Sequence, residues 1–125
     1  MTHVFSICTP YWSPSSTYIP IEEIVETKWP NFRYQIHLAS GEVEEHIQTK
    51  DEIKQFLNAC YGGRGPNGES GFEMTSGTNF ENLDKLGKTK LLNAETLEYY
   101  AEQYSRNGMH GTCEFQLCVG WDAFS

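Results

Sequence analysis

Residues 49–60 read Thr-Lys-Asp-Glu-Ile-Lys-Gln-Phe-Leu-Asn-Ala-Cys, and this segment carries the strongest structural signal in the chain. Thr49 and Glu52 have the spacing of a capping box, in which each side chain bonds to the backbone N–H of the other residue. The apolar side chains that follow share one helical face, because they recur at positions i, i+3, i+4 and i+7: Ile53, Phe56, Leu57 and Cys60. The segment predicts a capped amphipathic helix over residues 49–61, with the Cys60 thiol buried and inert.

A second helix is indicated further along the chain, over residues 93–107. Asn93 is a favoured N-cap residue, and Gly108 can end the helix in a left-handed conformation. Between them, apolar side chains repeat at helical spacing: Leu97, Tyr100, Ala101 and Tyr104. We therefore expect the two helices to pack apolar face against apolar face.

The segment between these helices begins with a glycine-rich loop. Residues 62–71 hold five of the eleven glycines, together with Pro66. A phosphate-binding loop would need a Lys-Ser/Thr pair followed directly by a helix, and neither is present. The loop is therefore predicted to have a structural role.

The N-terminal part gives weaker signals. The apolar run from Val4 to Ile7 predicts one buried strand, and Pro20 suits the start of a short helix that must stop before Pro30. Apolar residues alternate from Phe32 to Leu38, a pattern that by itself favours a strand.

Composition limits the functional classes. The 125 residues fit one domain, with 9 basic and 17 acidic side chains and a formal charge of −8. This balance disfavours nucleic acids and anionic membrane surfaces as partners. The sequence has no apolar run of about 20 residues, no signal-peptide pattern and no Cys-x-x-Cys pair, so we predict a cytoplasmic protein with reduced cysteines. Its four histidines are scattered, and neither a metal nor another cofactor is expected.

Several motifs together resemble the lid of soluble epoxide hydrolases of the α/β-hydrolase superfamily. Phe32-Arg33-Tyr34-Gln35 looks like the aromatic-x-Tyr-Gln motif that opens this lid. Residues 55–69 are similar to lids of the fungal branch, and residues 91–100 and 104–111 resemble its last long helix. The run from Val4 to Tyr11 resembles the core strand that leads into the lid.

This resemblance implies a mainly α fold, a small helical lid-like domain of the epoxide hydrolase cap type with one N-terminal strand. It also implies a helix over residues 32–38, against the alternating pattern. The expected organisation is one domain over residues 1–125. Residues 1–12 would be a core-strand remnant and linker, residues 13–115 the lid-like region, and residues 116–125 an unrelated apolar tail.

The resemblance also implies site residues. Tyr34 matches the first of two lid tyrosines that hydrogen-bond the epoxide oxygen, and Gln35 and Phe115 would contact substrate beside it. Gln116 stands where the second tyrosine is expected. The family's Asp nucleophile, His base and His-Gly-x-Pro oxyanion motif are not in this sequence. The chain is therefore predicted not to hydrolyse epoxides on its own.

Two other functions stay open at this point. One is a non-catalytic module that binds a small apolar ligand or a protein partner. The other is an enzyme with altered acid–base chemistry, using Tyr34 with a carboxylate such as Glu69 or Glu73. A homo-oligomer is also expected, because the N-terminal strand and the apolar tail would need to be covered.

Overall fold

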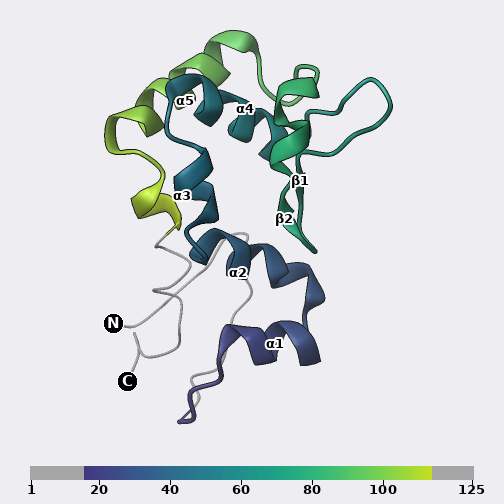
Figure 1. The fold of residues 1–125 in the computed structure, drawn as a ribbon, viewed down its shortest axis with the longest axis vertical. Helices are drawn as coiled ribbons and strands as arrows, with labels where there is room; N and C mark the ends of the chain where they lie inside the picture. The colour runs from purple at the N-terminus through teal and green to yellow at the C-terminus, as the bar shows by residue number, and fades with distance from the viewer. Residues whose placement is uncertain (1–15, 114–125) are drawn as a thin grey trace, which may run out of the picture.

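The computed structural model describes residues 16–113, a mainly helical fold that confirms the predicted class (Figure 1). The elements in chain order are α1 (Ile21–Thr27), the 3-10 helix η1 (Pro30–Phe32), α2 (Arg33–Ala39), α3 (Glu42–His46), α4 (Lys50–Cys60), β1 (Phe72–Glu73), β2 (Gly77–Thr78), the 3-10 helix η2 (Phe80–Lys85) and α5 (Ala94–Asn107). The predicted strand at Val4 and the apolar tail, on which the expected homo-oligomer depends, lie outside the described residues. No helix within residues 16–113 is long and apolar enough to cross a bilayer.

Helices α4 and α5 form as their sequences predict. Thr49 Oγ1 accepts the Glu52 backbone N–H at 3.3 Å, and Glu52 Oε2 accepts the Thr49 N–H at 2.8 Å, which completes the capping box. At the start of α5, Asn93 Oδ1 accepts the N–H of Thr96 at 2.7 Å. Gly108 ends α5 with φ +68°.

The two helices lie side by side and enclose most of the core, so the predicted pairing is confirmed (Figure 1). The buried members of this core come from both helices and from the segments around them: Val43, Ile47, Ile53, Phe56, Leu57, Ala59, Leu83, Leu97, Ala101, Met109 and Cys113. Tyr100 and Tyr104 pack against it while half-buried.

The prediction of a buried Cys60 does not hold for the residue as a whole. Cys60 is the last residue of α4 and is exposed. Enough protein surrounds the sulfur to raise the pKa of the Cys60 thiol to about 12, since a thiolate there would be poorly solvated. The group is therefore a thiol at neutral pH.

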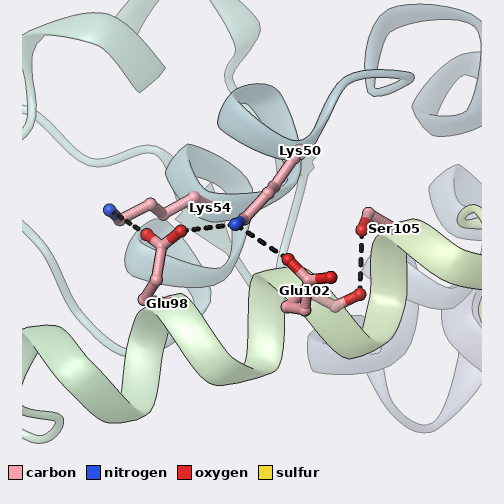
Figure 2. A network of polar contacts seen from close by, with 5 residues as sticks. All are labelled: Lys50, Lys54, Glu98, Glu102 and Ser105. Atoms are coloured by element: carbon pink, nitrogen blue, oxygen red, sulfur yellow. Dashed lines mark hydrogen bonds and ion pairs between the residues drawn. The ribbon is translucent and has the colours of Figure 1, made fainter.

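A network of ion pairs joins the solvent side of α4 to α5 (Figure 2). Lys50 Nζ lies 2.6 Å from Glu98 Oε1 and 2.9 Å from Glu102 Oε2, and Lys54 Nζ lies 2.5 Å from Glu98 Oε2. Hydrogen bonds from Lys50 and then Lys54 lower the pKa of Glu98 to about 2. Because this pKa is lowered in the folded chain, the contribution of Glu98 to stability is present above its ordinary value and is lost as the pH falls toward about 2.

The buried side chain of Asn58 ties the loop between the helices to α4. Its Nδ2 donates to the Gly87 carbonyl at 3.0 Å, and its Oδ1 accepts the Thr89 N–H at 2.8 Å. The Thr89 hydroxyl in turn donates to the carbonyl of Tyr61. These bonds hold both ends of the segment 62–89 beside the end of α4. This agrees with a structural role for the glycine-rich loop.

Two features of the middle of the chain differ from the residue patterns. Residues 33–39 form helix α2, so the strand favoured by alternation is wrong and the helix implied by the resemblance is confirmed. The reason is that α2 packs against α1, α3 and β2, which leaves its side chains half-buried on several sides. The antiparallel hairpin of β1 and β2, with Phe72 opposite Thr78 and Glu73 opposite Gly77, was not predicted. Strands of two residues are too short to show an alternating pattern.

Candidate functional site

Tyr34 is the second residue of α2, and the hairpin fixes its backbone. The first N–H groups of a helix have no partner within the helix. The Tyr34 N–H donates instead to the carbonyl of Met74, in the turn between β1 and β2, at 3.1 Å. The hairpin turn therefore caps α2 at the residue that the sequence singled out.

The Tyr34 ring is one step in a ladder of aromatic side chains. It stacks on Phe32, with ring centroids 6.3 Å apart, and meets Phe72 edge-on at 5.7 Å. Phe32 continues to Trp29 at 6.2 Å, and Phe72 continues to Phe56 at 6.3 Å. The ladder thus runs from the exposed Trp29 to the buried Phe56, and it holds Tyr34 half-buried in apolar surroundings.

The hydroxyl of Tyr34 contacts the side chain of the next residue. Gln35 Nε2 donates to it at 3.4 Å, which is a long and weak hydrogen bond. Among residues 16–113, no side chain or carbonyl accepts the phenol's own proton. The phenol can therefore donate a hydrogen bond to a bound group.

The structure brings together two of the predicted site residues, Tyr34 and Gln35. Phe115 and Gln116 lie outside the described residues, so their part in the site stays a prediction.

The two carboxylates considered for acid–base chemistry differ in setting. The backbone N–H groups of Glu69 itself and of Asn67 lower the pKa of the Glu69 carboxyl, which makes it a carboxylate at neutral pH and a poor proton donor. Glu73 lies exposed on β1, next to the Met74 that binds the Tyr34 backbone.

One turn along α2, His37 forms a second cluster that the sequence analysis did not single out. Its Nδ1 lies 3.4 Å from Glu42 Oε2, and its ring lies 5.7 Å from that of Phe80. His46 stacks on the Phe80 ring, with ring centroids 4.3 Å apart. Burial lowers the pKa of His37, against the opposing charge of Glu42. The available signal was the i, i+3 spacing of Tyr34 and His37, but Phe72, Gly77 and Phe80, which pack against them, are distant in sequence.

A depression of about 330 Å³ lies elsewhere, at the C-terminal end of α5. Its lining carries no charged side chain: Gln103, Tyr104, Asn107, Gly108, Gly111 and Thr112. Within the described part of the chain, no group of three potential ligand side chains converges as a metal site would require.

Comparison with known proteins agrees with the resemblance seen in the sequence. No protein-family model matches the chain. A curated protein of Neurospora crassa, "Epoxide hydrolase srdG", is 34% identical over 112 residues, which cover 86% of this chain and 32% of the relative. The chain is related to a fungal epoxide hydrolase. This epoxide-hydrolase-like chain spans about a third of the length of the relative that it matches.

Proposed function

We propose that residues 16–113 serve as the lid of an epoxide-hydrolase-like protein, in which Tyr34 donates a hydrogen bond to the epoxide oxygen. The observation that carries this proposal is the setting of the phenol. The Met74 carbonyl fixes the backbone of Tyr34, and Phe32 and Phe72 pack against its ring. No described group accepts the proton of its hydroxyl.

The chemistry of ring opening explains why such a donor matters. When a nucleophile attacks an epoxide carbon, the C–O bond breaks and negative charge develops on the oxygen. A fixed phenol that donates to this oxygen stabilises the transition state, and one such donor contributes about 3–4 kcal/mol in a site from which water is excluded. The rings of Phe32 and Phe72 cover part of the Tyr34 side chain with apolar surface.

The donor alone does not complete the reaction. Opening by a carboxylate forms an ester, which water must then hydrolyse with the help of a base. The motifs that carry the nucleophile and the base in the resembling family are not in these 125 residues. The role proposed for this chain is therefore that of the lid.

We expect the purified 125-residue chain to leave aryl and alkyl epoxides at their uncatalysed rate of hydrolysis. The reason is that a hydrogen-bond donor cannot replace an absent nucleophile. Diol formation measured by chromatography, with the Tyr34→Phe variant as the matched control, tests this. Turnover that survives repurification and is lost in Tyr34→Phe would contradict the lid proposal and favour altered acid–base chemistry.

A binding module for a small apolar ligand is the second candidate. It is favoured by two exposed apolar side chains near Tyr34. Trp29 is the outer end of the aromatic ladder, and the carbonyl of Met74 accepts the Tyr34 N–H. In such a module the phenol would orient a ligand without turnover.

A further inference from the structure

His37 lies where four elements meet. It is part of α2, and Glu42 of α3 and Phe80 of η2 approach its ring. Gly77 of β2 packs against the same ring so closely that a Cβ at that position would lie 2.5 Å from two ring atoms. Only 13% of the His37 side chain is exposed. The hairpin therefore rests directly on the imidazole.

The two ring nitrogens have different surroundings. Nδ1 faces the Glu42 carboxylate at 3.4 Å, whereas Nε2 is buried with no hydrogen-bond partner among the described residues. A neutral ring with its proton on Nδ1 leaves only a lone pair at Nε2. A protonated ring would place an N–H donor and a positive charge there without an acceptor, which is costly in a buried position.

Few other charges reach this ring. Glu42 favours the protonated form and His46 disfavours it, both from α3. The residues that β2 and η2 bring to the ring, Gly77 and Phe80, carry no charge. The packing around His37 therefore suits the neutral imidazole.

The same hairpin connects His37 to Tyr34. On β2 it contacts the imidazole through Gly77, and in its turn Met74 accepts the Tyr34 N–H. Each strand has only two residues, so the hairpin has little pairing of its own to hold its place. Its position therefore depends on contacts outside the hairpin: Phe72 packs against Tyr34 and Phe56 on the β1 side, and Gly77 packs against His37 on the β2 side.

We propose that neutral His37 is a positioning residue for Tyr34. Its protonation displaces the β1–β2 hairpin and breaks the hydrogen bond between the Tyr34 N–H and the Met74 carbonyl. The meaning of this coupling for catalysis rests on the proposed function, but the coupling itself does not. Burial holds the pKa of His37 below its ordinary value of 6.5. The packing of the hairpin against His37 is thus fully favoured above pH 6.5 and is weakened as the pH falls below 6.5.

Amide hydrogen exchange followed by NMR on the full chain tests the coupling, with the His37 ring signals recorded in the same samples. We expect the protection factor of the Tyr34 amide to fall several-fold between about pH 7.5 and pH 5, because protonation of the buried ring weakens the packing of the hairpin. His37→Phe keeps a ring against Gly77 but cannot titrate, so its Tyr34 protection should not depend on pH. His110→Gln, which changes an exposed histidine that pairs with Glu44, should keep the wild-type transition.

Tyr34 protection that stays constant while the His37 ring titrates would overturn the proposal. A transition that persists unchanged in His37→Phe would overturn it as well. If His37→Phe does not fold, Glu42→Gln gives a second test: without the carboxylate that favours the cation, the transition should move to lower pH, and an unmoved transition contradicts the proposal. Tyr34→Phe in a catalytically competent protein tests the proposed function separately.

Discussion

Replacement of Leu57 by alanine is expected to lower the free energy of unfolding by about 2–5 kcal/mol. Leu57 is 7% exposed and belongs to the core shared by α4 and α5. Truncation removes apolar contacts and leaves a cavity in this core. Urea denaturation followed by circular dichroism measures the change.

Leu91→Ala is the matched control, because Leu91 is 74% exposed. The same truncation at this position should change the free energy of unfolding by no more than about 0.5 kcal/mol. A Leu57→Ala effect as small as that of Leu91→Ala would show that the facing surfaces of α4 and α5 are not packed in solution.

Gly77→Ala is expected to destabilise the chain by more than about 2 kcal/mol, and to abolish the protection of the Tyr34 amide. Two physical terms add at this position. The φ of +96° is unfavourable for alanine by about 1–2 kcal/mol, and the new Cβ would lie 2.5 Å from the His37 ring. Because the backbone of β2 and the ring cannot both stay in place, the hairpin should leave α2.

Gly41→Ala separates these two terms. Gly41 has a similar φ of +88°, but a Cβ there would meet no atom within 4 Å. It should therefore show only the backbone term of about 1–2 kcal/mol and should keep the Tyr34 amide protected. Equal effects of the two substitutions on stability and on Tyr34 protection would mean that the hairpin does not rest on His37.

The helices that build the core could be predicted because their signals are local. Thr49 with Glu52, and Asn93 before α5, mark helix starts within one turn of sequence, and both helices keep an apolar face of helical period. The packing of α4 against α5 then follows from the rule that the apolar faces of two helices pack together.

The surroundings of Tyr34 could not be predicted in the same way. Helix α2 contacts neighbours on several sides, so its apolar residues show no helical period and even alternate. The hairpin that caps Tyr34 comes from about forty residues further along the chain, and its strands are too short to leave a pattern. The family resemblance predicted the helix and the importance of Tyr34. The roles of Met74, Gly77 and His37 could be recognised only in the structure.

The most direct test of the lid proposal is the kcat of a chimera in which residues 16–113 replace the matching part of the Neurospora crassa epoxide hydrolase. We expect this chimera to hydrolyse an epoxide, and Tyr34→Phe to lower its kcat about a hundredfold or more, the effect of losing one oxyanion donor. A chimera that turns over equally well with tyrosine or phenylalanine at position 34 would show that Tyr34 does not donate to the epoxide oxygen.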